Sequence, residues 1–171
     1  MGACRIAIHQ NIVPTIDEET KEELDIDTID TTPFAMFAVF DGHGGPACAE
    51  FLTQSVSTVL SHSPVLYDED LAPFERRAVA TASSFDELEK VHNEWAHESG
   101  DLSGSTAILS TFEDGILVMA GVGDSAGLYV DHLGNTHTLC PQHSTDNAKE
   151  VARVLNMGGT IINGRVSLLR P

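Results

Sequence analysis

The stretch FAVFDGHGGP, residues 37–46, decides how this chain is organised. Residues 34–40 are apolar almost throughout, which is typical of a strand buried on both faces. Asp41 follows where this strand would leave the core, so its carboxylate is available to a cation. Three of the next four residues are glycines, which allow a tight turn and a close approach of the backbone to a ligand. Pro46 suits the first turn of a helix, because its missing N–H would be unpaired there in any case.

The segments around this stretch predict a mixture of helices and antiparallel strands. Apolar residues spaced near 3.6 predict a helix over 47–60 and a second one over 74–98, which Ser83 and Ser84 could interrupt, since a serine there could cap a new helix. Residues 5–13 alternate loosely and could form a first strand. Apolar runs separated by turns predict an antiparallel meander over 107–140, and a last helix is expected over 145–155. The pattern favours the α+β class.

Length and composition favour one globular domain covering residues 1–171. Of these residues 42% are hydrophobic, and the mean hydropathy is −0.04. The formal net charge of −17 argues against binding to nucleic acid or to an anionic membrane, since both would be repelled. No run is long enough to span a bilayer, and the first residues do not resemble a secretory signal.

The three cysteines, Cys4, Cys48 and Cys140, show no pairing pattern, which predicts free thiols in a reducing compartment. We therefore expect an intracellular location, cytoplasmic or nuclear. Much of the negative charge is concentrated in an acidic insert at about 15–31. The simplest interpretation of this insert is a solvated loop or a short exposed helix, and the alternative is a docking element for a basic partner.

The string FAVFDGHGG resembles the signature of the metal-dependent Ser/Thr protein phosphatases of type 2C. The strings SGSTA, residues 103–107, and VGDS, residues 122–125, resemble further segments of that family and follow in the same order. The resemblance implies an α-β-β-α sandwich, in which two antiparallel sheets pack face to face between flanking helices. It extends from residue 34 to 166, but over only the first half to two-thirds of a family catalytic domain. An incomplete fold is therefore expected, with a missing C-terminal half or a partner chain to complete it.

The same resemblance implies an activity and a set of site residues. The family hydrolyses phosphoserine and phosphothreonine in phosphoprotein substrates with two Mg²⁺ or Mn²⁺ ions, which activate a water and neutralise phosphoryl charge. By resemblance, Asp41 and the carbonyl of Gly42 are metal ligands, and Asp124 belongs to an additional, weaker metal position. His43 is the candidate general acid for the leaving alkoxide, and Arg5 is the candidate phosphate ligand.

The sequence also departs from the family pattern. With Arg5 laid on the family's arginine, His9 and Gln10 fall where two metal-binding acids are expected. Gln142 stands in place of another acid, and Ala126 in place of an arginine. Two hypotheses stay open: a working phosphatase, or a catalytically weak or inactive pseudophosphatase that serves as a regulatory or binding module.

Overall fold

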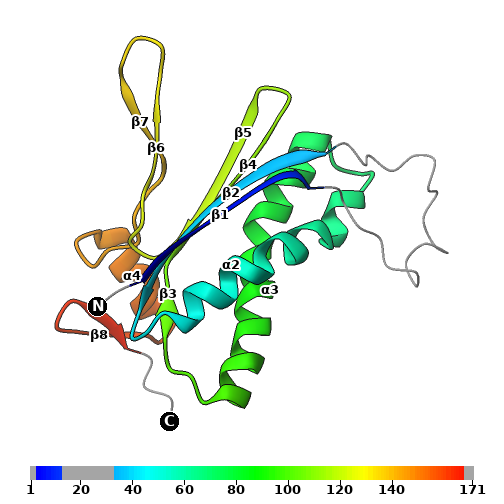
Figure 1. Cartoon of the computed structure of the whole chain (residues 1–171). Helices are drawn as coiled ribbons and strands as arrows, with labels where there is room; N and C mark the ends of the chain where they lie inside the picture. Colours follow the sequence, from blue (N-terminus) through cyan, green and yellow to red (C-terminus); the bar gives the residue numbers. More distant parts are fainter. Residues whose placement is uncertain (1–2, 13–32, 168–171) are drawn as a thin grey trace.

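The computed structural model describes residues 3–12 and 33–167, so the predicted acidic insert lies outside the described residues. Its centre is one antiparallel sheet of five strands in the order β1-β2-β4-β5, with β3 paired to the end of β2 (Figure 1). The strands are β1 (Ala3–Ile12), β2 (Phe34–His43), β3 (Gly104–Ser105), β4 (Ala107–Glu113) and β5 (Ile116–Val122).

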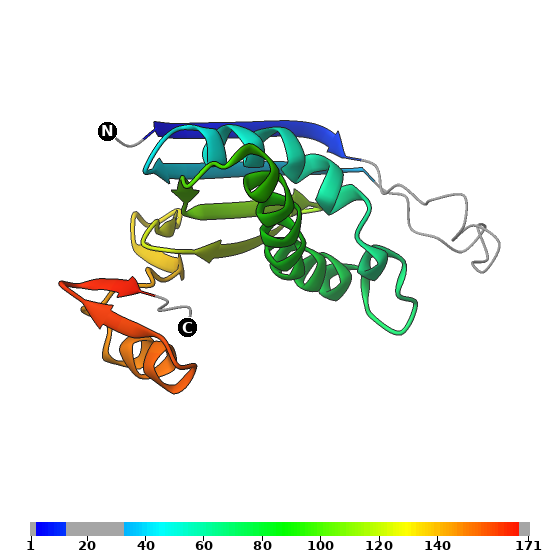
Figure 2. The ribbon, with the colours of Figure 1, turned by 90° about the horizontal axis from the view of Figure 1, so that it is seen from below.

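Two helices cover one face of this sheet. They are α2 (Ala47–Ser61) and α3 (Pro73–Ser99), joined through the short 3₁₀ helix η2 (Pro64–Tyr67), and Figure 2 shows both on the same side of the strands. The core lies between these helices and the sheet. Its largest fully buried side chains come from β2, β4, α2 and α3, namely Phe40, Met36, Leu60, Leu109, Val56, Thr81 and Thr111.

Strand β2 is buried on one face, which corrects the prediction of a strand buried on both. Its residues alternate, with Met36 and Phe40 fully buried and Phe37 and Val39 exposed on the opposite face. The alternation follows from the pleat, which points successive side chains to opposite faces. The apolar residues at alternate positions therefore have no helix over them.

Helix α3 runs without a break, so Ser83 and Ser84 do not interrupt it. Their hydroxyls donate hydrogen bonds to the carbonyls of Ala80 and Thr81 three residues earlier, within the helix, and cap no new one. The helix ends at Gly100, which adopts the left-handed conformation that glycine allows, with φ of 70°.

The rest of the described chain forms smaller units beside the sheet. They are a hairpin of β6 (Gly127–Val130) and β7 (Thr136–Cys140), helix α4 (Ala148–Asn156), and a hairpin of β8 (Thr160–Ile162) and β9 (Arg165–Ser167). Helix α4 begins three residues later than predicted, because the side chain of Asn147 accepts a hydrogen bond from the N–H of Lys149 and caps it there. The β6–β7 hairpin stands away from the helices in Figure 1 and meets β5 only at its base, where Gly127 lies against Met119.

The α+β class is confirmed, with one layer of the expected sandwich fully formed. On the second side of the sheet the described residues place the β6–β7 hairpin, and the segments that follow it approach only the strand end that carries Asp41 (Figures 1 and 2). Over residues 3–12 and 33–167 no helix has the length and apolar composition needed to cross a membrane. The three cysteines are free thiols, as predicted.

Candidate active site

A pocket of about 540 Å³ gathers four of the five predicted site residues. It lies where β2 and β5 end and where two later segments approach them. Asp41, Gly42, His43 and Asp124 all line it, together with Thr106, Gly123, His143, Ser144, Thr145, Gly164, Arg165 and Val166. Residues from five separate parts of the chain thus converge on one cavity.

The end of β2 is held closely on both sides. A side chain at Gly42 would place its Cβ 2.9 Å from the carbonyl oxygen of Ala3 and 3.0 Å from the Cβ of Ala49, so only glycine fits between β1 and α2. His43 pairs with Gly104 of β3, and a Cβ on that glycine would lie 2.7 Å from Nε2 of the imidazole. The ring of His43 therefore rests on the bare backbone of Gly104, which fixes its place at the pocket wall.

Thr106 joins the two carboxylate-bearing segments. Its N–H donates to the carbonyl of Asp41 at 3.0 Å, and its hydroxyl lies 2.6 Å from that of Ser125. Gly123 packs against the same threonine, with a φ of 89° that favours glycine. Asp41 and the Gly123–Ser125 turn are thus positioned by one residue, through its backbone N–H and its side chain.

The segment at Gln142 and His143 is tied to the same turn. The Gln142 side-chain amide donates to the carbonyl of Asp124, and the His143 N–H donates to the carbonyl of Gly123 at 2.8 Å. An ionised carboxylate at position 142 has no proton to donate. The glutamine therefore donates a hydrogen bond to the Asp124 carbonyl that an ionised acid at this position could not donate. His143 also lines the pocket, although the sequence analysis gave it no role.

A polar network links the turn after His43 to the loop before β3. The Ser103 hydroxyl accepts a hydrogen bond from the N–H of Cys48 at 2.9 Å and donates to the Asp101 carboxylate. These hydrogen bonds from Ser103 lower the pKa of Asp101 and keep it ionised. The first turn of α2 is therefore anchored to the loop that precedes β3.

The structure does not place Arg5 in this pocket. Arg5 stands opposite Phe40 in the β1–β2 register, so its side chain points to the helix-covered face, whereas Asp41 points to the other face. Its guanidinium forms an ion pair with Glu50 of α2 at 2.5 Å. The expectation that Arg5 binds the substrate phosphate is therefore not supported by this geometry.

The register also shows how far His9 lies from Asp41. The residue opposite Asp41 is Cys4, and His9 stands opposite Met36, five positions further along the sheet. At about 3.4 Å per residue, His9 is roughly 17 Å from the strand end that carries Asp41. His9 therefore does not line the pocket, and the interpretation of His9 and Gln10 as replacements for metal-binding acids stays a prediction.

Arg165 is a pocket residue whose role the sequence did not assign. It begins β9, and within the part of the chain that the structure describes it forms no ion pair. The cue that could have identified it is its charge, because it is the one cation that lines this pocket among the described residues.

The donors in the pocket do not complete a two-metal centre. Asp41 and Asp124 are its only carboxylates among the described residues, and no group of three or more His, Cys, Asp or Glu side chains suited to a metal occurs in residues 3–12 and 33–167. Mg²⁺ and Mn²⁺ favour six or so oxygen ligands in which carboxylates and waters predominate. Two carboxylates and a backbone carbonyl supply part of such a set.

The comparisons with known proteins agree with the fold. A family model described as protein phosphatase 2C matches residues 17–168. The chain therefore belongs to the protein phosphatase 2C family, which confirms the resemblance. It is 34% identical over 135 residues to a probable protein phosphatase 2C (member 13, mitochondrial) of rice, covering 78% of this chain and 35% of the relative. It is 28% identical over 147 residues to protein phosphatase 1L of Bos taurus, covering 84% of this chain and 40% of the relative.

Solved structures show the same fold at lower sequence identity. The serine-threonine phosphatase 2C of Toxoplasma gondii superposes with a TM-score of 0.61 at 20% identity, over 91% of this chain and 55% of that one. A sex-determining protein of C. elegans gives a TM-score of 0.66 at 21% identity, over 96% of this chain and 41% of that one. The chain spans about 30–40% of the length of the first curated relatives that it matches. Some relatives are named as mitochondrial, so the cytoplasmic or nuclear location stays a prediction.

Proposed function

We propose that this chain carries part of the catalytic centre of a metal-dependent protein Ser/Thr phosphatase. The observation that supports the proposal is the convergence of Asp41, Gly42, His43 and Asp124 on one pocket with a single arginine. The substrate would be a protein bearing phosphoserine or phosphothreonine. The cofactor would be Mg²⁺ or Mn²⁺, with Asp41, the Gly42 carbonyl and Asp124 as ligands from this chain.

The residues of this chain have separate roles in the proposal. His43 donates a proton to the alkoxide that leaves, because its imidazole is at the pocket wall and is held there by Gly104. Arg165 takes the role first expected of Arg5 and binds the phosphoryl oxygens through its planar guanidinium.

Completion of the centre would require polypeptide outside the described residues. The second face of the five-stranded sheet carries exposed apolar side chains, and the pocket supplies too few carboxylates for two ions. We propose that one additional layer, from the same protein or from a partner chain, covers this face and supplies further metal ligands.

The alternative function is a pseudophosphatase, in which the same fold serves as a regulatory or binding module. The observation that favours it is the same shortage of donors in the pocket. The two functions differ in their metal affinity and turnover, which makes them separable by one experiment.

The test is Mn²⁺ titration by calorimetry on the chain, with p-nitrophenyl phosphate turnover in the same buffer, for wild type, Asp41→Asn and the control Asp114→Asn. Asp114 lies in the β4–β5 turn with a φ of 46°, which asparagine also tolerates. A chain that carries these metal ligands should bind Mn²⁺ more tightly as wild type and as Asp114→Asn than as Asp41→Asn, and any turnover by the chain alone should fall about a hundredfold on Asp41→Asn. Equal millimolar binding by all three proteins without turnover would support the pseudophosphatase.

A further inference from the structure

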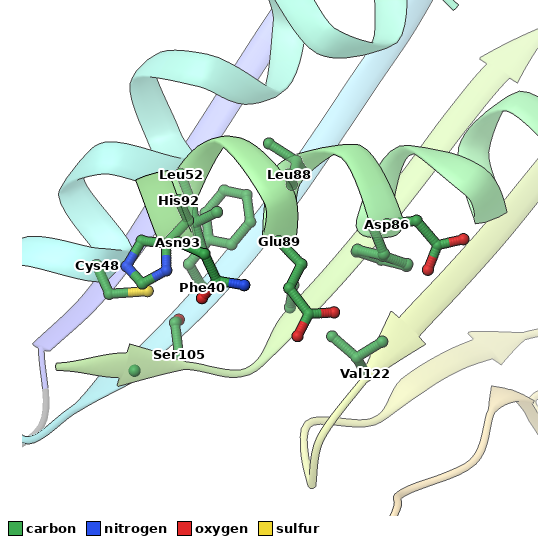
Figure 3. A pocket seen from close by; sticks show the side chains of 13 residues that line it. Phe40, Cys48, Leu52, Asp86, Leu88, Glu89, His92, Asn93, Ser105 and Val122 are labelled. Atoms are coloured by element: carbon green, nitrogen blue, oxygen red, sulfur yellow. The ribbon is translucent and has the colours of Figure 1, made fainter. Parts of the chain in front are cut away.

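A second cavity of about 410 Å³ lies between α2, α3 and the strands, on the helix-covered side of the sheet (Figure 3). It shares no lining residue with the candidate active site. Its volume is within the range of pockets that hold small organic ligands. It is therefore a site to be explained separately.

The walls of this cavity are apolar. They are formed by side chains of β2, α2, α3, β4 and β5, namely Phe40, Leu52, Phe85, Leu88, Ala107 and Val122. The Cys48 thiol also lines it, and burial, with the nearby charge of Asp101, raises its pKa to about 11. The thiol stays neutral near pH 7, so these walls favour an uncharged, apolar body.

The rim of the cavity on α3 is acidic. Asp86 and Glu89 lie three residues apart, and Asn93 follows four residues later, so all three lie on one side of the helix. Neither carboxylate has an ion-pair partner within the described part of the chain, and none of the residues lining the cavity is Lys or Arg. With a chain charge of −17, the rim attracts cations.

His92 supplies an independent sign of a missing polar partner. Its ring is held by Phe51 and Trp95, at centroid distances of 5.7 and 5.6 Å, and it lines the cavity. Its Nε2 is buried and has no hydrogen-bond partner among the described residues. Buried polar atoms are normally paired, so this nitrogen marks a position where a ligand atom would gain a hydrogen bond.

We propose that this cavity binds a small organic amine, with its apolar body against the walls and its ammonium group at Asp86 and Glu89. The apolar walls supply affinity by removing hydrocarbon from water, and the two carboxylates select a cation over a neutral or anionic molecule of the same shape. The charge complementarity is confined to the rim, where the ammonium group keeps part of its hydration.

Strand β3 connects this cavity to the candidate active site. Gly104 and Ser105 line the cavity, while their partners His43 and Gly42 line the active-site pocket. A ligand against β3 therefore touches the strand on which the His43 ring rests. Binding should be sensed at His43, whether or not the chain is a working phosphatase.

The test is an NMR titration of the 171-residue chain with 2-phenylethylamine, and with 2-phenylethanol as the neutral analogue. We expect saturable shifts of the Leu88, Glu89 and Ser105 amides and smaller shifts at His43. The amine should bind at least threefold more tightly than the alcohol. Binding of neither compound, equal binding of both, or shifts that map elsewhere would each overturn the proposal.

The matched variants separate the rim from the general charge of the chain. Asp86→Asn with Glu89→Gln removes two exposed carboxylates at the cavity, and Glu94→Gln with Glu98→Gln removes two exposed carboxylates elsewhere on α3. The first pair should weaken amine binding by roughly threefold to tenfold and leave alcohol binding unchanged. The second pair should change neither. Equal weakening by both pairs would show non-specific attraction and would contradict the proposed site.

Discussion

The two faces of the five-stranded sheet are built from the same strands and have opposite surroundings. On the face toward α2 and α3, Met36 and Phe40 are 0% exposed. On the other face, Phe37 is 42% exposed and Ile6 of β1 is 63% exposed. Both faces are apolar, but only one is covered within the described residues. The residues on both faces of the sheet are thus suited to burial, while helix packing stabilises only one of the two faces.

The largest effect should come from truncating matched phenylalanines on the two faces. Phe40→Ala removes a fully buried ring from the helix-covered face and should lower the free energy of unfolding by about 3–5 kcal/mol. Phe37→Ala, three residues away in the same strand, should cost about 1 kcal/mol or less, because much of its ring is already in water. Urea unfolding monitored by circular dichroism measures both.

Equal losses for these two variants would show that the second face is buried in solution. Self-association is the simplest route to such burial. Sedimentation velocity on the wild-type chain would then separate an assembled protein from the 18.3 kDa monomer.

The rates of thiol labelling should differ between the two faces of the sheet. Cys4 of β1 is exposed on the uncovered face, whereas Cys48 is buried under the helices with its pKa raised to about 11. Since the thiolate is the reactive form, Cys48 should react with a disulfide reagent at pH 8 at least roughly a hundredfold more slowly than Cys4.

The control for labelling is Cys4→Ser, which should remove the fast phase and leave the slow phases intact. A fast phase that persists in this variant would mean that α2 opens often enough to expose Cys48. Mass spectrometry of the labelled peptides identifies which thiol has reacted.

The smallest effect is expected at the tip of the β6–β7 hairpin, which covers only a corner of the second face. Hydrogen bonds from His137, and then from Asn135, lower the pKa of Asp131 to about 2. Because the pKa is lowered in the folded state, these hydrogen bonds stabilise the hairpin tip at pH values above the ordinary carboxyl pKa of 3.8. This stabilisation is lost as the pH falls from about 4 to 2. Amide shifts of Leu133 and Asn135 should report this change.

In Asp131→Asn the same amides should show no transition in that pH range, and urea unfolding of the sheet should hardly change. Loss of sheet stability in this variant would show that the hairpin contributes more to the second face than its contacts suggest.

The sequence predicted the parts of the fold and site that depend on local pattern. The string at 37–46 identified Asp41, Gly42 and His43, and the turn at 122–125 identified Asp124; all four line one pocket. Periodicity located α2, α3 and the meander, because apolar spacing is a local property.

The errors arose where distant segments decide the outcome. The register of β1 is set by which of its side chains face α2, and the loose alternation over 5–13 left that open. The phosphate contact expected of Arg5 depended on this register, which turns its side chain toward Glu50. His143 and Arg165 reach the pocket only because the segments after β7 fold back to Gly123 and Thr145, which no short pattern records.

The contact between His43 and Gly104 has a consequence for how this chain can diverge in evolution. A methyl group at position 104 would lie 2.7 Å from the imidazole nitrogen, so the His43 ring would have to shift to make room for it. A single substitution at Gly104 would displace the histidine ring, although every residue that lines the active-site pocket would stay the same. A lineage could thus exchange one role of this pocket for another without altering any residue that lines it.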